Sequence, residues 1–278
     1  MEVAVILSTR MSVRIADLYF DEPAPAGLKA DIIRYNQSPV PTPGSECTPC
    51  STIVVDLLLP QDELFCNLKS HTRQKIRRTQ KDELTYEFSN DGDQDTLVRF
   101  ADHLNRCRDL KLLPRVGRKR LFILARQKAL DLSWVRDQSG EMLCASSYVI
   151  TPFRVRGLLA GASYRNTTDP TRRTMIGRAN RLLYWRDIVR FKAAGFRFFD
   201  FGGYYMGSED QEKLRINGFK EEFGGEVLHE FNCQKGMTVK GNFMLWAIRR
   251  RSEWMMRKRS RALQSAVEEN ESSIPASI

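Results

Sequence analysis

The stretch FDFGGYYMGSEDQEKLRINGFKEEFGGE, residues 199–226, indicates more about the fold than any other. Its aromatic start ends in a Gly-Gly pair, a charged helical pattern follows, and a Phe-Lys pair leads into a second Gly-Gly. We expect a strand that ends at Gly202 and Gly203, at the carboxyl edge of a sheet, where α/β proteins tend to place ligand sites. Glycines permit positive φ there and let a substrate backbone approach closely, although a tight strand-to-helix turn would also use them.

The segments around this stretch alternate between strand and helix patterns. From Thr85 onward we expect a strand, two helices, three meandering strands, a helix, a strand, a helix and a strand. Before it, residues 52–59 predict a buried strand, and residues 61–84 predict one helix with Leu64, Leu68 and Ile76 on its apolar side. Hairpins followed by strand–helix–strand crossovers predict a mixed α/β (α+β) sheet.

The length of 278 residues suits one large domain with additions at both ends. Residues 1–51 hold short strand patterns that prolines interrupt, so we expect an N-terminal partial module or an extension. Residues 52–238 form the predicted main domain. Residues 239–278 form a predicted basic helix, as far as about residue 266, and a polar tail.

The cysteines and histidines form no metal-binding pattern. Of six cysteines only Cys47 and Cys50 lie close together, and no second Cys-x-x-Cys or His pair follows them. We therefore predict no metal site, and reduced cysteines with structural roles. No apolar run is long enough to span a bilayer, and the N-terminus lacks the features of a signal peptide, so we expect a cytoplasmic protein.

The formal net charge of +10 makes a polyanionic partner plausible. Nucleic acid, anionic lipid and phosphorylated substrates all remain open. In the predicted helix at 61–84, Arg73, Arg77 and Lys81 recur every four residues and share one face. That face could bind the phosphates of a tRNA backbone or of a nucleotide-linked acceptor, or it could simply be solvated.

The order of elements resembles the GNAT acyltransferase fold, with a short N-terminal partial module and a C-terminal basic helix added. Two motifs resemble the Fem-type aminoacyl transferases, which build peptidoglycan bridges: FFDFGG at 198–203 followed by GFKEEFGGE at 218–226, and LKSHTRQKIRRTQK at 68–81. The resemblance covers roughly residues 52–233. Fem proteins usually contain two GNAT-like domains, whereas residues 1–51 could supply only part of the first.

The resemblance implies an N-acyltransferase that moves an aminoacyl group from aminoacyl-tRNA to an amine of a cell-wall precursor, a peptide or a natural-product intermediate. It marks Lys220, in the pair Phe219-Lys220, as the residue at the tRNA end and the transition state. A fixed cation there would stabilise the tetrahedral oxyanion, and Phe219 and Phe223 would dehydrate its surroundings. A lysine on a helix surface is the plain alternative. Asp200 could orient a cation, accept the nucleophile's proton, or cap a loop.

The ester of the donor is already activated, so we expect no cofactor beyond the donor as co-substrate. Tyr164, Tyr204 and Tyr205 lie at the ends of predicted strands near the proposed cleft. They could stack on a nucleobase or bind a carboxylate, or they could be buried aromatic residues.

A GNAT enzyme that uses acyl-CoA or an acyl carrier protein is the second hypothesis. The phosphate loop of CoA-dependent members follows the pattern Q/R-x-x-G-x-G/A, and TRRTMIGRAN at 171–180 departs from it by one residue. Arg172 and Arg173 remain candidate anion contacts at the start of that helix. A non-catalytic basic adaptor is the third hypothesis.

The C-terminal helix combines apolar and basic residues. Phe243, Trp246 and Arg250 recur at helical spacing, and cations crowd the sequence from Arg249 onward. We expect the helix to dock its apolar stripe first and to bind RNA second. Peripheral contact with a membrane is the alternative.

Overall fold

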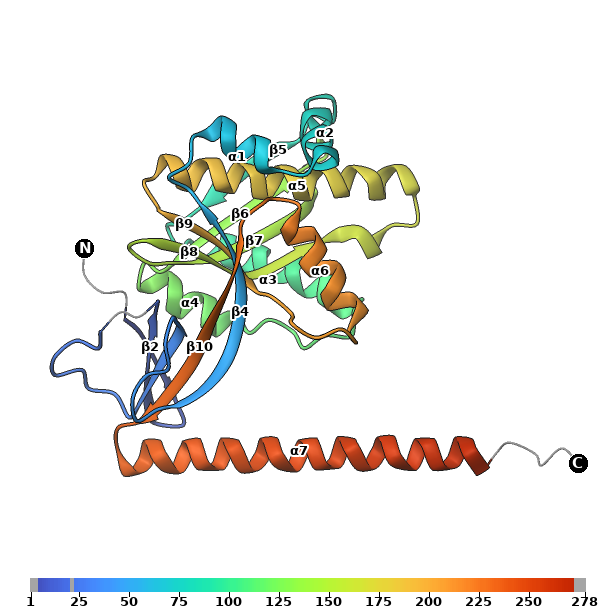
Figure 1. Cartoon of the computed structure of the whole chain (residues 1–278). Coiled ribbons are helices and arrows are strands. Elements are labelled where there is room, and N and C mark those ends of the chain that lie inside the picture. The colour runs from blue at the N-terminus through green and yellow to red at the C-terminus, as the bar shows by residue number, and fades with distance from the viewer. Residues whose placement is uncertain (1–4, 21–22, 273–278) are drawn as a thin grey trace, which may run out of the picture.

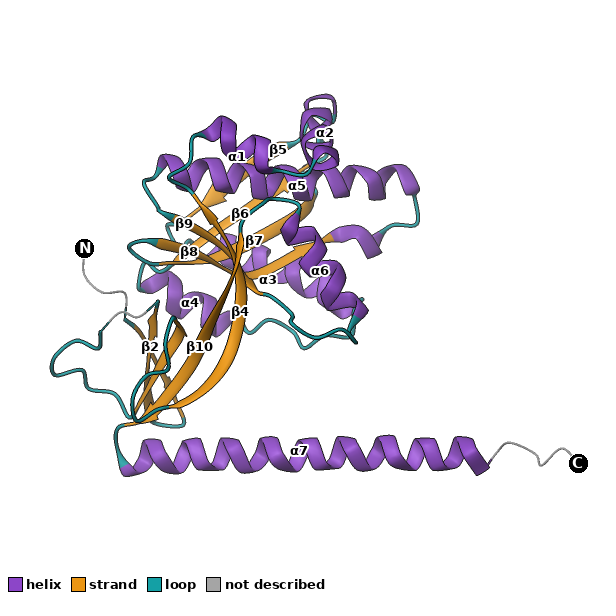
Figure 2. Ribbon diagram, in the orientation of Figure 1, coloured by secondary structure: helices purple, strands orange, loops and turns teal. Residues whose placement is uncertain are grey.

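The computed structural model, which describes residues 5–20 and 23–272, contains a mixed sheet of ten strands (Figure 1). Helices cover both faces of this sheet (Figure 2). The strands are β1 Ile6–Arg10, β2 Val13–Tyr19, β3 Ile32–Ser38, β4 Glu46–Asp56, β5 Thr85–Ser89, β6 Leu130–Arg136, β7 Met142–Ile150, β8 Arg154–Ala162, β9 Phe198–Gly203 and β10 Glu226–Gly236.

The helices agree in order with the sequence prediction from Thr85 onward, so that prediction is confirmed. The α-helices are α1 Gln61–Asn67, α2 Ser70–Arg78, α3 Gln94–Asp109, α4 Arg118–Arg126, α5 Pro170–Ala193, α6 Gln211–Glu221 and α7 Val239–Ser272, and the 3-10 helices are η1 Thr79–Lys81 and η2 Ser163–Asn166.

The strand order is β1-β2-β3-β10-β4-β9-β8-β7-β6-β5. Strands β5 to β8 form an antiparallel meander, and β8 pairs with β9 in parallel across the helix α5. The mixed sheet that the hairpins and crossovers predicted is therefore confirmed.

The two faces of the sheet bury separate clusters of apolar side chains. Helices α1, α2 and α5 cover one face, where Leu64, Ile76 and Phe191 pack on Phe199 of β9. Helices α3 and α4 cover the other face, where Phe100 lies in a cluster with residues of β6 and β7. The sheet is thus covered on both sides along its meander, which leaves the ends of the strands as the places for a site.

The N-terminal strands belong to the same sheet, because β3 pairs with β10. The predicted boundary between residues 51 and 52 falls within β4, and the division into domains stays a prediction. Pro49 lies inside β4 although proline cannot donate a ladder hydrogen bond. The carbonyl of Ser51 accepts a hydrogen bond from Tyr204 N on the side of β4 that faces away from β10. Because residues two apart in a strand turn their backbone groups to the same side, the nitrogen of Pro49 also faces away from β10, at a point where β4 does not yet pair with β9.

Cys47 of β4 and Cys233 of β10 form a disulfide between directly opposed residues. The expectation that all six cysteines are reduced is therefore wrong for this pair. Their spacing of 186 residues hides the contact in the sequence, because it follows from the pairing of two strands that lie far apart in the chain. Cys50, Cys66, Cys107 and Cys144 are free thiols.

The expected helix at 61–84 is wrong, because the structure has two short α-helices and a 3-10 turn. Leu68 is extended, with ψ of 145°, and its side chain is buried. Burying Leu68 turns the chain, so α2 starts afresh at Ser70. Lys81 lies in η1 and not on the face of α2.

Helix α7 leaves the sheet at the end of β10 and extends along one side of the molecule (Figure 1). Docking before Arg249 occurs, but not through the expected stripe. Leu245 is buried against β2 and β3, whereas Phe243 is 66% exposed and Trp246 is 49% exposed. Within residues 5–20 and 23–272, no helix is long and apolar enough to cross a bilayer.

Candidate active site

Strands β8 and β9 diverge at the place where the sequence predicted a site. They pair in parallel only from Arg154↔Phe198 to Arg156↔Asp200, and β8 then continues to Ala162 without β9 beside it. This divergence opens the carboxyl edge of the sheet, where α/β proteins tend to hold their ligands.

The first glycine pair shapes this edge through Gly202. Its φ is +74°, and a Cβ there would lie 2.7 Å from the carbonyl oxygen of Gly157 on β8. Both facts require glycine, because an L-residue would be strained and would clash with the backbone. Gly203 is exposed and has open space around its Cα. The predicted positive φ is present at Gly202, but the backbone that approaches it closely is that of β8, and approach by a substrate backbone stays a prediction.

Lys220 lies in the last turn of α6 and points at the end of β9. Its Nζ donates to the carbonyl of Gly202 at 2.9 Å and also to that of Gly203. Burial lowers its pKa to about 8, Asp200 opposes that shift, and Arg156 adds to it. The structure therefore brings Lys220 together with the first glycine pair, across 17 residues of sequence.

The Lys220 ammonium has one N–H group left to donate to another acceptor. An ammonium carries three N–H donors, and the two carbonyls take two of them. Phe219 packs on Tyr184 and Phe223 rather than over Lys220, with ring centroids 5.4 Å apart in each case. These rings hold the helix that carries the lysine.

Asp200 of β9 is fully buried, and both of its oxygens have donors. Oδ1 accepts from the hydroxyl of Thr52 and from Gly202 N at 2.7 Å, and Oδ2 accepts from Gln37 at 2.9 Å and from Arg154 Nε at 3.0 Å. Asp200 thus orients a cation and caps the turn at Gly202. Its oxygens are occupied, so it is not placed to take a proton from a nucleophile.

The partners of Asp200 form a buried charge cluster that sequence reasoning missed. Arg154 of β8 makes a bidentate pair with Glu230 of β10, with N–O distances of 2.6 and 3.1 Å, and its guanidinium lies 4.2 Å from the ring of Phe20. Gln37 of β3 bridges Asp200 and Glu230. Charged residues inside apolar strand patterns were the available signal, but only the sheet order brings them together.

Tyr204 and Tyr205 follow β9 and border the same edge. The Tyr204 hydroxyl donates to Glu221 at 2.6 Å, which raises the pKa of that tyrosine. The backbone of Tyr205 is bonded in both directions by the side-chain amide of Asn217, at 3.0 and 2.7 Å. Both tyrosines are half-buried and are bonded to residues of α6, the helix that carries Lys220. Asn217 was not identified from the sequence.

Tyr164 lies elsewhere, in η2 at the end of β8. Its ring packs on Gly177 of α5, 3.6 Å from the position of a Cβ there, and burial raises its pKa. The commoner alternative from the sequence, a buried aromatic residue with a bonded hydroxyl, describes it, because Arg181 and Asn180 bond its side chain.

The start of α5 is occupied by protein groups. The carboxylate of Asp169 accepts from the backbone N–H groups of Thr171 and Arg172, at 2.9 and 3.3 Å. The Arg172 side chain pairs with Asp137 at 3.1 Å and also with Glu141. These carboxylates fill the anion position that the sequence offered, so Arg172 is not a free anion contact. Arg173 is exposed one residue further on.

The predicted basic face of α2 is only partly available. Arg73 is half-buried, and its Nη1 donates to the carbonyls of Cys66 and Leu68. It therefore closes the end of α1, and this nitrogen is not free for the phosphate contact that the sequence suggested. Arg77 and Lys81 are exposed.

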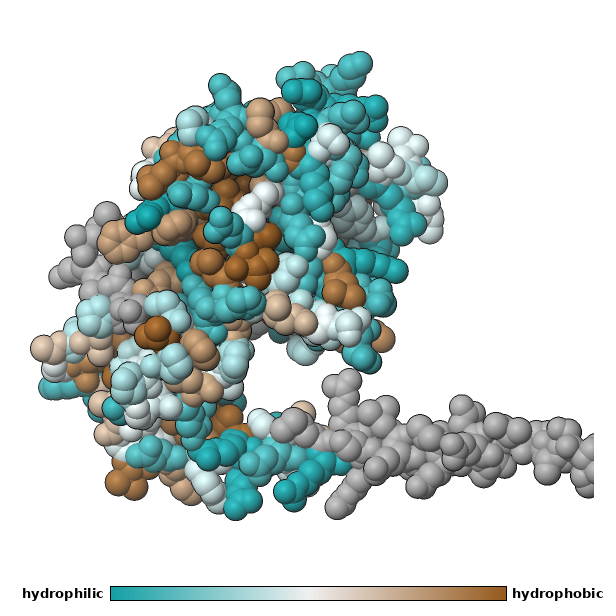
Figure 3. Space-filling view, viewed as in Figure 1, coloured by the Kyte–Doolittle hydropathy of each residue, from teal (hydrophilic) through white to brown (hydrophobic). Residues whose placement is uncertain are grey.

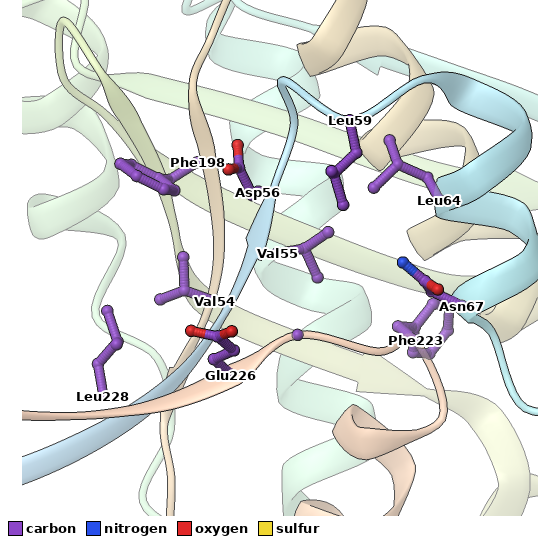
Figure 4. A pocket seen from close by; sticks show the side chains of 11 residues that line it. Val54, Val55, Asp56, Leu59, Leu64, Asn67, Phe198, Phe223, Glu226 and Leu228 are labelled. Carbon is purple, nitrogen blue, oxygen red and sulfur yellow. The ribbon is translucent and has the colours of Figure 1, made fainter.

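The second glycine pair, Gly224 and Gly225, lies directly before β10. Gly225 has φ of +102°, and a Cβ there would lie 2.6 Å from the carbonyl oxygen of Val54, so glycine lets β10 start against β4. A cavity of about 390 Å³ lies beside it, and the carboxylates of Asp56 and Glu226 line it together with apolar side chains that include Val55 and Phe223 (Figure 4). Lys220 does not line this cavity. Lys220 contacts the first glycine pair instead.

Comparison with known proteins shows the fold. No protein-family model and no curated protein match the sequence. The structure of FemX matches with a TM-score of 0.60 at 12% identity, over 82% of this chain and 83% of FemX. L-PGS from Bacillus licheniformis has a TM-score of 0.48 at 14% identity, over 78% of this chain and 72% of L-PGS. N-myristoyltransferase from Saccharomyces cerevisiae has a TM-score of 0.39 at 12% identity, over 73% and 52%.

The predicted GNAT-like fold is thus confirmed. Within that class, the chain resembles FemX in structure, as the two motifs indicated. Identity of 12% shows the fold alone, so the reaction is argued from the site.

Proposed function

We propose that this protein is an N-acyltransferase that moves an aminoacyl group from aminoacyl-tRNA to the amine of a cell-wall precursor, a peptide or a natural-product intermediate. One observation carries the proposal: the Lys220 ammonium is held by the carbonyls of Gly202 and Gly203, and burial lowers its pKa to about 8. The GNAT-like fold and the Fem-type motifs support it.

The proposed step is aminolysis of an ester. The lone pair of the neutral acceptor amine attacks the carbonyl carbon, the π electrons of the carbonyl move to its oxygen as an oxyanion, and the nitrogen becomes positively charged. The free proton of Lys220 donates to that oxygen. The ester C–O bond then breaks, and the departing ribose oxygen takes the proton that the amine loses. A desolvated cation stabilises such an oxyanion more than a solvated cation does.

The start of α5 favours tRNA over CoA as the donor. CoA-dependent relatives would place the pyrophosphate at the N-terminus of this helix. Here the Asp169 carboxylate accepts from the first free N–H groups, and Asp137 and Glu141 hold Arg172. A pyrophosphate at that position would meet negative charge. Because tRNA is aminoacylated in the cytoplasm, we propose that the protein acts there.

A donor competition tests the proposal. Labelled aminoacyl-tRNA, made with a mixture of amino acids, and labelled acetyl-CoA are each incubated with the protein and a panel of amine acceptors. The panel includes a lysine-containing peptide and a nucleotide-linked cell-wall precursor. We expect label to move from tRNA to an acceptor amine, and unlabelled aminoacyl-tRNA to compete better than deacylated tRNA. Transfer from acetyl-CoA alone would reject the donor that we propose.

A further inference from the structure

The first turns of α7 are fixed on the N-terminal strands. Leu245 is 6% exposed and packs with Val13, Ile15 and Ile32. Lys240 Nζ donates to the carbonyl of Ser12 in the turn between β1 and β2. The side of the helix that faces away from these contacts therefore has a defined direction relative to the sheet.

That outward side exposes large apolar residues. Phe243 and Trp246 stack on each other with centroids 5.6 Å apart. Met11, in the turn that Lys240 contacts, is 83% exposed, and apolar surface is visible at this end of the strands (Figure 3). Scattered exposed apolar residues are ordinary, but a series along one helix marks a contact surface. On this side the series comprises Val239, Phe243, Trp246 and Trp254, each at least 49% exposed.

Cations alternate with these residues. Arg250 lies 5.8 Å from the Trp246 ring centroid, and Arg251 and Arg257 are exposed. At 100° per residue, Phe243, Trp246, Arg250 and Arg257 fall within one half of the helix surface. A helix with aromatic residues beside arginines suits the boundary between lipid headgroups and acyl chains.

We propose that the outward side of α7 binds the surface of a membrane that contains anionic lipid. Charge complementarity selects an anionic surface. The exposed apolar surfaces of Val239, Trp246 and Trp254 select lipid over RNA, because burying them gains free energy in a bilayer interface and gains little against a polyphosphate backbone. This surface is separate from Lys220, so the inference goes beyond the proposed function and does not depend on it.

Vesicle cosedimentation of the full chain tests the inference. We expect binding to vesicles with about one-third phosphatidylglycerol at physiological salt, and binding at least about tenfold weaker to pure phosphatidylcholine. Replacement of Arg250 and Arg251 by Gln should lower binding about 30-fold, from roughly fivefold for each cation near an anionic surface. The matched control replaces Lys119 and Arg126, two exposed cations of α4, and should bind as the unchanged protein does.

Tryptophan fluorescence separates lipid from RNA. Quenching by vesicles with brominated acyl chains reports insertion, and Trp246→Phe should remove part of it. The control Phe153→Ser changes an aromatic residue that is 63% exposed on the β7–β8 turn and should leave the quenching unchanged. Unchanged vesicle binding after the two arginine replacements, or an absence of acyl-chain quenching, would overturn the proposal. Loss of tRNA binding in those variants with vesicle binding intact would assign the surface to RNA.

Discussion

Arg154, the first residue of β8, and Lys220 of α6 are two cations that bond residues of β9, and their surroundings differ in one respect. Arg154 is paired with the carboxylates of Asp200 and Glu230, and these charges raise its pKa against the effect of burial. Among the residues that the structure describes, Lys220 hydrogen-bonds to backbone carbonyls and to no carboxylate, and burial lowers its pKa to about 8.

The difference separates a cation that supports the fold from one that can support a reaction. The charge of Arg154 is neutralised in the resting protein, so a new anion nearby would gain little from it. The charge of Lys220 is desolvated and not neutralised, so an oxyanion that forms beside it would gain the missing partner. A reaction that develops negative charge is the one this arrangement favours.

Loss of Arg154 should give the largest effect, on stability. Arg154→Met leaves Asp200 and Glu230 buried without their cation, and we expect the free energy of unfolding to fall by about 3–5 kcal/mol. Urea unfolding followed by circular dichroism measures it. The control is Arg118→Met, which removes a surface ion pair with Asp102 and should cost less than about 1 kcal/mol. Equal losses in the two variants would remove the distinction between the cations.

Loss of Lys220 should act on turnover instead. Lys220→Ala should lower kcat by about two to three orders of magnitude, the loss expected for an oxyanion donor, while circular dichroism shows the fold retained. Lys119→Ala, on the exposed side of α4, is the matched control. Turnover within a few-fold of the unchanged enzyme would place Lys220 outside the mechanism.

The pH profile should report the protonation of Lys220. Its folded pKa of about 8 lies below the usual lysine value of 10.5, so the cation is present below pH 8 and is lost above it. We expect kcat to fall above about pH 8, by about tenfold per pH unit. The same shift means that stability rises with pH between these two values, because the unfolded chain holds more protons there.

The variant Asp200→Asn sharpens this test. Asp200 raises the pKa of Lys220, so the descending limb should move to lower pH when its charge is removed. Asp102→Asn, on the exposed side of α3, should leave the limb in place. A limb that does not move in Asp200→Asn would show that the two groups are not coupled.

The salt dependence of donor binding should give the smallest effect. Each phosphate contact that a cation makes contributes about 0.7–0.9 to the slope of log affinity against log salt. Because Arg77 and Lys81 are exposed while Arg73 is bonded to backbone, Arg77→Gln with Lys81→Gln should flatten the slope by about 1–2, and Arg73→Gln should not change it. Filter binding at several salt concentrations measures this. A slope unchanged by the double replacement would exclude this face.

The sequence predicted the order of elements well, because hydrophobic periodicity and turn residues are local signals. The hairpin at residues 138–140, the glycine at 195 that ends α5 and the caps of α3 all follow such signals. The prediction of one helix at 61–84 failed at Leu68, where burial of one side chain interrupts the helical pattern. Sequence reasoning also missed the Cys47–Cys233 bond, which depends on which strands pair.

The residues of the candidate site also fall into those that a local sequence signal predicted and those that depend on which strands pair. Gly202 and Lys220 were found from a motif, and the structure joins them. Arg154, Glu230 and Gln37 were missed, because their contacts with one another and with Asp200 span between 46 and 193 residues and exist only once β3, β10, β4, β9 and β8 have paired in this order. Arg172 was placed correctly at the start of α5, but its two acidic partners come from the β6–β7 turn.

The bond between Cys47 and Cys233 makes most of the chain a covalent ring. Strands β5 to β9 and every residue from Arg73 to Lys220 lie inside it. A protease cut in any loop of the ring would leave one molecule, whose two pieces separate only when a reductant opens the bond. Where disulfides persist the body of the protein thus tolerates a broken backbone, and in a reducing cytosol the same cut divides the chain in two.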